Sequence, residues 1–176
     1  MKNKIITAAI LSSSILLADT IYVSNEKDNT ISVIDSLTNT VTETIKVGQR
    51  PRGILLNNDK TQLYICASDD DTVQVLDLKT KKIIYNLPSG EDPEQFALTP
   101  DGKELYVSNE DDAIVTVVDT VNRSVVTQIE VGVEPEGMAV SPDGTVAINT
   151  TETSNFLHWI DTKTKKIIHN TLVDQR

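Results

Sequence analysis

The sequence GEDPEQFALTPDG at residues 90–102 returns 42 positions later as GVEPEGMAVSPDG at residues 132–144. Each copy contains a Gly-x-x-Pro turn, a short apolar run and a Pro-Asp-Gly turn. An aspartate that follows another apolar run recurs with the same spacing, and its four copies are Asp35, Asp77, Asp119 and Asp161. A fixed period of this length is typical of a repeat architecture, in which each repeat is one supersecondary unit.

Each repeat contains short apolar runs with many β-branched residues, separated by turns rich in Asn, Asp, Gly and Pro. Four such runs in a repeat predict a four-stranded antiparallel sheet, which is the blade of a β-propeller. We therefore expect an all-β fold with about four blades. The predicted blades lie near residues 21–50, 51–92, 93–134 and 135–176.

The first predicted blade lacks its innermost strand, and four blades are the lower limit for a closed propeller. The sequence therefore favours an incomplete ring. An open arc exposes sheet edges that can pair with another chain, so we expect self-association through the open blade edges. The alternatives are a tight closure of the four units and assembly into a larger ring.

Residues 1–18 precede the repeats and are typical of a secretory signal peptide. Lys2 and Lys4 come before an apolar run over residues 5–17, and the small residue Ala18 follows the run. The run has 13 residues, which is too short to cross a bilayer comfortably. We therefore expect cleavage near Ala18, and a periplasmic propeller over residues 19–176 that does not contact the membrane.

The formal net charge of the chain is −10. This excess of acidic residues disfavours binding to nucleic acid or to an anionic membrane surface. Cys66 is the only cysteine, so an intrachain disulfide is excluded. Because Cys66 aligns with Ser24 and Ser108 in a column of small strand residues, we expect a packed and unreactive thiol.

The predicted strand directions place two sets of loops at opposite ends of the propeller. The first set joins the second strand to the third strand and one blade to the next, and we call this end the acidic end. Its acidic residues are Glu26, Asp28, Asp69, Asp70, Asp71, Glu91, Asp92, Glu94, Glu110, Asp111, Asp112, Glu134, Glu136 and Glu152. The only basic residues in the same loops are Lys27, Arg50 and Arg52. The opposite end carries Lys60, Lys79, Lys81, Lys82, Lys103, Arg123, Lys163, Lys165 and Lys166. The asymmetry favours a cationic partner or ligand at the acidic end, since complementary charge speeds association; the alternative is that these loops are only solvated.

The innermost strands begin with Arg52, Glu94 and Glu136, near the mouth of the central channel. A ring of such residues can hold a small ligand where the loops converge, although the same residues would also simply solvate the mouth. The candidate residues for binding a ligand or partner are Arg52, Glu94, Glu136, Arg50, Asp92, Glu134, Glu26, Asp70, Glu110 and Asp112.

Nothing in the sequence predicts a catalytic constellation. His158 and His169 are the only histidines, and both occupy strand positions where other repeats have ordinary residues, so we expect surface roles. The polar column of Ser32, Gln74, Thr116 and His158 is expected to face away from the packed side. The chain has no Cys-x-x-Cys-His, Gly-rich phosphate loop or zinc-ligand spacing. We therefore predict no catalytic residue, no metal site and no cofactor.

The run Tyr22-Val-Ser-Asn25, repeated at residues 106–109, resembles the signature of the YVTN family of β-propeller repeats. The Val-Gly-x-x-Pro turns and the Ser-Pro-Asp-Gly turn at residues 141–144 belong to the same pattern. A narrower set of stretches is similar to one subgroup, the PQQ-dependent catabolism-associated β-propeller proteins; these stretches are residues 22–30, 50–53, 66–72 and 133–144. The resemblance implies an exported protein linked to quinoprotein alcohol oxidation, and it carries over no catalytic residue.

The charge pattern and the resemblance together predict a non-enzymatic accessory protein. It would dock a periplasmic c-type cytochrome or a quinoprotein dehydrogenase through its acidic end. One alternative is a hydrolase or oxidoreductase that uses carboxylates with a metal or cofactor on this face. Another is an adhesion module of the cell envelope.

Overall fold

The computed structural model describes residues 19–173, so the predicted signal peptide lies outside the described part. Fifteen β-strands and one short 3-10 turn, η1 (Ser68–Asp70), make up the secondary structure of these residues. No helix among them is long and apolar enough to cross a membrane. The all-β prediction is therefore confirmed.

The strands form four separate antiparallel sheets in sequence order. Blade 1 contains β1 (Thr20–Asn25), β2 (Thr30–Asp35) and β3 (Thr40–Lys46). Blade 2 contains β4 (Pro51–Leu56), β5 (Gln62–Ala67), β6 (Thr72–Asp77) and β7 (Lys82–Pro88). Blade 3 contains β8 (Pro93–Leu98), β9 (Glu104–Asn109), β10 (Ile114–Asp119) and β11 (Ser124–Glu130). Blade 4 contains β12 (Pro135–Val140), β13 (Val146–Thr151), β14 (Phe156–Asp161) and β15 (Lys166–Leu172).

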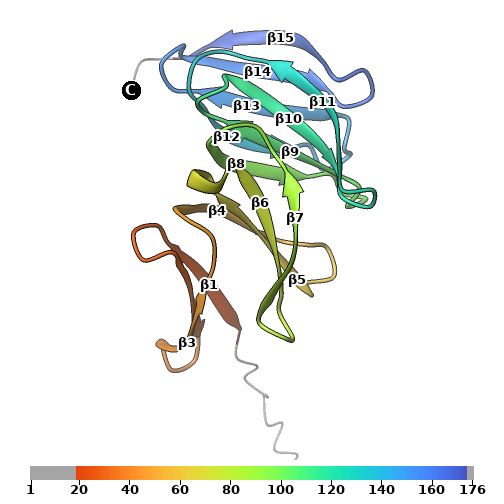
Figure 1. Ribbon diagram of the computed structural model, residues 1–176. Helices are drawn as coiled ribbons and strands as arrows, with labels where there is room; N and C mark the ends of the chain where they lie inside the picture. Colours follow the sequence, from red (N-terminus) through yellow and green to blue (C-terminus); the bar gives the residue numbers. More distant parts are fainter. Residues whose placement is uncertain (1–18, 174–176) are drawn as a thin grey trace, which may run out of the picture.

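The four sheets stack face to face along an arc, with blade 1 at one end and blade 4 at the other (Figure 1). The innermost strands β4, β8 and β12 are neighbours along the inner side of this arc. Within residues 19–173 the first and last sheets do not pack on each other, so the predicted open ring of about four blades is confirmed.

The hydrophobic core lies between the sheets and is divided into one cluster for each pair of neighbouring blades. Between blades 2 and 3, for example, Val73 and Val75 of β6 pack against Leu105 and Val107 of β9. Cys66 belongs to this cluster and is fully buried, and burial raises the pKa of its thiol. The prediction of a packed cysteine is confirmed. Each blade is thus stabilised by the apolar faces of its neighbours.

Cationic side chains from the turn between the third and fourth strands connect each blade to the preceding one. Lys81 lies 5.6 Å from the ring centre of Tyr22, and Lys165 lies 5.3 Å from that of Tyr106. Arg123 from the equivalent turn lies 3.7 Å from the ring centre of Tyr85. A cation over an aromatic ring is attracted by the negative face of the ring. We call these contacts the cation–tyrosine latches.

The latch between blades 3 and 4 is the most extensive and allows a direct test. The Lys165 ammonium also donates hydrogen bonds to Glu104, to the Thr162 carbonyl and, over 2.9 Å, to the Tyr106 hydroxyl. Lys165→Met removes hydrogen bonds made by a largely buried charge, so the free energy of unfolding should fall by roughly 2 kcal/mol. For a chain of this size, the melting temperature should fall by about 4 to 8 °C.

Lys163→Met is the matched control, because Lys163 lines the same surface depression but is exposed and makes no ion pair within the described residues. It should leave the melting temperature within about 1 °C of that of the unchanged chain. Equal melting temperatures for the two variants in differential scanning calorimetry would show that the latch does not stabilise the fold.

The polar column on the third strands was predicted to face away from the packed side, and this prediction is wrong. Thr116 is fully buried, and His158 is 5% exposed. Gln74 Oε1 accepts a hydrogen bond of 2.7 Å from the Gly48 N–H, and His158 Nε2 accepts one of 3.1 Å from the Gly132 N–H. These side chains hold the Gly-x-x-Pro turns, whose N–H groups need acceptors. His169, by contrast, is exposed as expected.

Candidate functional site

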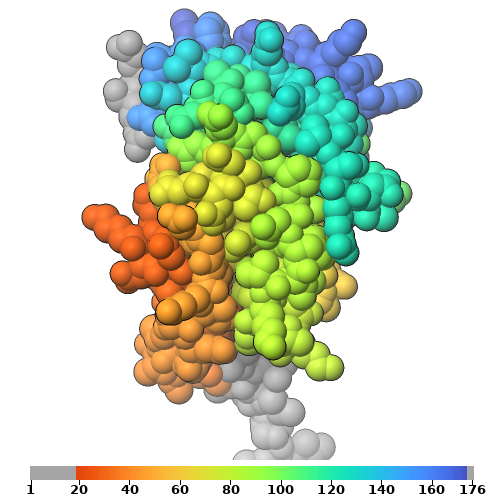
Figure 2. All heavy atoms as spheres, in the orientation of Figure 1, coloured from red at the N-terminus to blue at the C-terminus, as the bar shows by residue number. Residues whose placement is uncertain are grey.

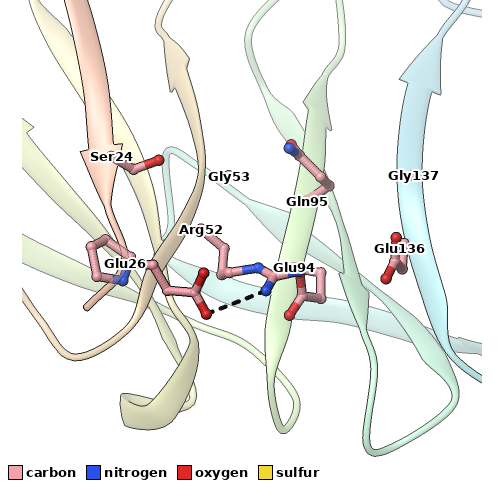
Figure 3. A pocket seen from close by; sticks show the side chains of 9 residues that line it. Ser24, Glu26, Arg52, Gly53, Glu94, Gln95, Glu136 and Gly137 are labelled. Carbon is pink, nitrogen blue, oxygen red and sulfur yellow. Dashed lines mark hydrogen bonds and ion pairs between the residues drawn. The ribbon is translucent and has the colours of Figure 1, made fainter. Parts of the chain in front are cut away.

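A cavity of about 370 Å³ opens on the inner side of the arc, at the acidic end. It lies among the starts of the innermost strands and the end of β1 (Figure 3). Its lining is formed by Ser24, Glu26, Pro51, Arg52, Gly53, Glu94, Gln95, Glu136 and Gly137. All three residues predicted to surround the channel mouth, Arg52, Glu94 and Glu136, therefore line one cavity.

A glycine lets two innermost strands approach closely beside this cavity. A Cβ atom on Gly53 would lie 2.7 Å from the Gln95 side-chain oxygen and 2.7 Å from the Glu94 carbonyl oxygen. Both distances are shorter than van der Waals contact, so only glycine fits at this position without a shift of its neighbours. The spacing of β4 and β8, and with it the position of Glu94, depends on Gly53.

Arg50 connects three blades at the edge of the cavity. Its guanidinium donates to both carboxylate oxygens of Asp92, over 3.0 and 2.9 Å, and to Glu94 over 3.1 Å. Its Nε also donates to Glu26 over 3.3 Å. The hydrogen bonds to Asp92 raise the pKa of Arg50 further above its usual range, so the guanidinium stays charged. Glu26 belongs to blade 1, Arg50 precedes blade 2, and Asp92 and Glu94 belong to the start of blade 3.

Arg52 forms a second bridge between blades, from Glu26 to Glu94. It donates to Glu26 over 3.4 Å and forms a close ion pair with Glu94 (Figure 3). Glu94 is only 3% exposed, so this carboxyl contacts two guanidinium groups while it is almost removed from water. Two arginines supply part of the compensation that a buried carboxylate requires.

Two pairs of carboxyl groups follow along the mouth toward blade 4. Burial raises the pKa of Glu94 to about 7 despite the nearby Arg52, and a hydrogen bond with Glu110 raises it as well. Burial also raises the pKa of Glu136, and the next causes are a hydrogen bond and charge repulsion from Glu152. Two carboxylates this close favour sharing one proton, because like charges disfavour full ionisation of both. The mouth therefore becomes more negative as the pH rises through neutrality.

Three predicted binding residues instead hold the loops of the acidic end. Asp70 accepts a hydrogen bond of 2.8 Å from the Gln49 N–H, and Asp112 accepts one of 2.7 Å from the Glu91 N–H. Glu134 accepts a close hydrogen bond from the Thr153 hydroxyl. Asp70, Asp112 and Glu134 lie outside the cavity lining and bind loop groups, so the structure places them beside the site. Arg50, Asp92 and Glu110 also lie outside the lining, but their charged groups lie next to Glu94 at its edge.

Asp92, Glu94 and Glu110 bring one carboxylate oxygen each to within 4.8 Å of one another, a spacing that could hold a cation. Oxygen ligands of this kind suit Mg²⁺ or Ca²⁺. However, Arg50 already donates to Asp92 and Glu94. The Arg50 guanidinium therefore already supplies these two carboxylates with the positive charge that a metal ion would otherwise bring.

Sequence reasoning missed that this site is built from arginine and acid at equivalent repeat positions. Arg50, Asp92 and Glu134 share one column of the repeat, as do Arg52, Glu94 and Glu136. Equivalent positions of neighbouring blades meet at the axis, so opposite charges in one column predict a contact between blades. This signal was present in the aligned repeats. The buried position of His158 had no comparable signal.

The comparisons with known proteins agree with this architecture. The family model described as the YNCE-like beta-propeller matches residues 3–111. The chain belongs to the YNCE-like β-propeller family. The model of the cytochrome D1 heme domain matches residues 58–172 of this YNCE-like chain. The predicted resemblance to β-propeller repeat proteins is thus confirmed, whereas the narrower YVTN and PQQ assignments stay predictions.

A solved structure, the hydrazine synthase of Kuenenia stuttgartiensis, is also similar to the YNCE-like chain. The two are 26% identical in sequence, with a TM-score of 0.80 over 88% of this chain and 46% of the hydrazine synthase chain. The YNCE-like chain thus spans about half the length of that protein. No curated protein matches the sequence.

The described residues of the YNCE-like chain do not fit a heme at the inner cavity. A heme needs an axial ligand such as His, Cys, Met or Tyr, and none of these residues lines the cavity. Both ring nitrogens of His158 are already hydrogen-bonded, to the Gly132 N–H and to Asn170. The carboxylates and Arg52 that form the lining make it strongly polar instead.

Proposed function

We propose that this YNCE-like chain is a non-enzymatic docking module that binds a cationic protein partner at its acidic end. One observation carries the proposal. Arg50 and Arg52 neutralise the carboxylates between blades 1 and 3. Toward blade 4, no lysine or arginine of residues 19–173 forms an ion pair with Glu110 or Glu136. This part of the mouth keeps uncompensated negative charge, which favours a positively charged surface.

The partner class that we propose is a basic c-type cytochrome. The match to the cytochrome D1 heme domain supports a heme-protein context, and the periplasmic location expected from the predicted signal peptide is compatible with it. The link to quinoprotein alcohol oxidation, with a quinoprotein dehydrogenase as the other partner, rests on the resemblance of the repeats alone.

Isothermal titration calorimetry with a basic c-type cytochrome tests the proposal. Because the attraction is electrostatic, affinity should fall at least tenfold when the salt concentration rises from about 20 to 200 mM. Glu136→Gln removes a carboxyl group from the cavity lining and should weaken binding by roughly threefold at low salt.

Glu43→Gln is the control of equal charge, because Glu43 is exposed on the outer strand β3, away from the acidic end. It should leave the affinity unchanged. Binding that does not depend on salt, or equal losses from both variants, would contradict docking at the acidic end. Stoichiometric metal in the purified protein would instead favour the alternative of a metal-assisted enzyme that uses Asp92, Glu94 and Glu110.

A further inference from the structure

The first half of the mouth shows how this fold holds a guanidinium group at its acidic end. Arg52, at the start of β4, lies between Glu26 of the β1–β2 loop and Glu94 at the start of β8. It donates to Glu26 over 3.4 Å and forms a close ion pair with Glu94. A planar guanidinium carries five N–H donors in a fixed fork, so one arginine can satisfy two carboxylates from different blades.

The same positions recur two repeats later, but an acid takes the place of the arginine. The counterpart of Glu26 is Glu110 in the β9–β10 loop, and the counterpart of Arg52 is Glu136 at the start of β12. Both belong to blades 3 and 4, which lie at the opposite end of the molecule from blade 1 (Figure 2). Within the described part of the chain, no ion pair reaches Glu110 or Glu136. The repeated position therefore lacks the cation that Arg52 supplies.

Protons take the place of this cation. Glu94 is hydrogen-bonded to Glu110, and Glu136 is hydrogen-bonded to Glu152. A hydrogen bond between two carboxyl groups needs a proton, because two carboxylates can only accept. Burial raises the pKa of Glu94 to about 7, so the first pair keeps its proton close to neutral pH. A bound cation would favour the ionised carboxylates and release protons.

The charged and titratable groups around the two pairs set the sign of this coupling. Those that face Glu94 are Arg50 and Arg52 from the start of blade 2, Asp92 from its own turn, Glu110 from the β9–β10 loop and the buried Cys66 thiol from β5. Those that face Glu136 are Glu152, Glu110 and Arg52. The two arginines already contact carboxylates of blades 1 and 3, so a further cation beside Glu110 comes from outside the described residues.

The inner cavity gives a long side chain access to this place. Glu94 and Glu136 both line the cavity, which opens at the acidic end and has a volume of about 370 Å³. Figure 3 shows Glu26, Arg52, Glu94 and Glu136 following one another along it. The volume lies in the range of small-ligand sites, so an extended arginine side chain fits.

We propose that an arginine side chain of the docking partner binds among Glu94, Glu110 and Glu136, as Arg52 binds between Glu26 and Glu94, and releases a proton to the solvent. This inference rests on the proposed docking function and names the group that the acidic end recognises. Arginine suits the place better than lysine, because the neighbouring position of the same fold already holds a guanidinium between two carboxylates. Binding strengthens as the pH rises, since the bound state holds fewer protons than the free state.

Titration of the chain with N-acetylarginine amide, followed by NMR, tests the site without a protein partner. The expected dissociation constant at pH 8 is about 1 mM, which is ordinary for a ligand of this size. The affinity should be about tenfold lower at pH 6, because binding must then displace a proton. N-acetyllysine amide should bind more weakly, and the neutral N-acetylcitrulline amide should not bind. No binding of the arginine probe at pH 8, or equal binding of the citrulline probe, would overturn the proposal.

Two variants locate the probe. Glu136→Arg supplies the missing cation from the chain itself, so it should abolish binding of the arginine probe. Glu110→Gln removes one carboxylate and should weaken binding about tenfold at pH 8. Glu43→Arg is the matched control for the first variant, because it makes the same change in charge on the exposed outer strand β3; it should keep the affinity within about twofold. A cooperative thermal melt verifies that each variant is folded, and unchanged affinity in both site variants would overturn the proposal.

Titration with a basic c-type cytochrome separates this inference from the docking function on which it rests. If N-acetylarginine amide binds at the site and the cytochrome does not bind, the guanidinium site stands and the proposed partner is wrong. If the cytochrome binds the unchanged chain and Glu136→Arg equally, with the expected salt dependence, docking stands and the guanidinium site is not used in it. That second result would overturn the inference alone.

Discussion

Arg50→Met should lower the free energy of unfolding by about 3 kcal/mol at pH 8, since removing one partner of a buried ion pair leaves its charge uncompensated. The guanidinium of Arg50 donates three hydrogen bonds to Asp92 and Glu94, which are 12% and 3% exposed in their side chains. Methionine keeps much of the apolar stem but supplies no donor. Urea unfolding followed by circular dichroism at pH 8 and pH 5 measures the effect.

The pH dependence separates lost charge from lost packing. At pH 5 Glu94 is largely protonated, because its pKa lies at about 7, so only Asp92 loses a charged partner and the destabilisation should be smaller. Arg50→Lys is the control, because it keeps the charge and loses only the paired geometry. An equal loss of stability at both pH values would indicate that Arg50 acts through packing alone.

The fold could be predicted from the repeat because one pattern constrained all four blades at once. The alternation along β6 and β10 and the turns at residues 99–102 and 141–144 each fix only a short segment. Their recurrence every 42 residues fixes which strands pair and which blades are neighbours. The open ring could be predicted in the same way, from the strand that the first repeat lacks.

The candidate site could be located from the sequence, and the repeat columns also predict that arginines and acids of neighbouring blades meet there, but the carboxylate that each arginine binds could not be predicted. The starts of the innermost strands converge in any propeller, which is why Arg52, Glu94 and Glu136 were found together. Which carboxylates Arg50 would bind depended on side-chain lengths and on the close approach at Gly53. Asp70 was predicted as a binding residue on charge alone, although its oxygens were needed by the backbone of a neighbouring turn.

Glu94 should make the stability of the chain fall as the pH rises from about 5 to 7.5. The carboxyl group has its ordinary pKa of 4.5 in the unfolded chain and a pKa of about 7 in the folded chain, raised first by burial. Between these values the folded state binds more protons than the unfolded state, so stability decreases with rising pH. This difference between the two pKa values corresponds to about 3 kcal/mol in the free energy of unfolding. That stability is lost progressively as the pH rises from the unfolded pKa through the folded pKa of about 7. The exposed turn aspartates act in the opposite direction and at lower pH, as the pKa of Asp143, lowered to about 2 by hydrogen bonds, shows.

Glu94→Gln should remove most of this slope, because the amide stays neutral while it fills the same space between Arg52 and Glu110. Relative to the unchanged chain, the variant should be equally stable near pH 5 and up to about 3 kcal/mol more stable at pH 8. The remaining slope should come from Glu136, whose pKa is also raised by burial. Glu26→Gln is the matched control, since Glu26 is an exposed partner of the same Arg52. Urea unfolding at half-unit steps from pH 5 to pH 8 measures all three chains. If Glu94→Gln kept the slope of the unchanged chain, the proton would reside elsewhere, and the carboxyl pair at the mouth would not respond to pH near neutrality.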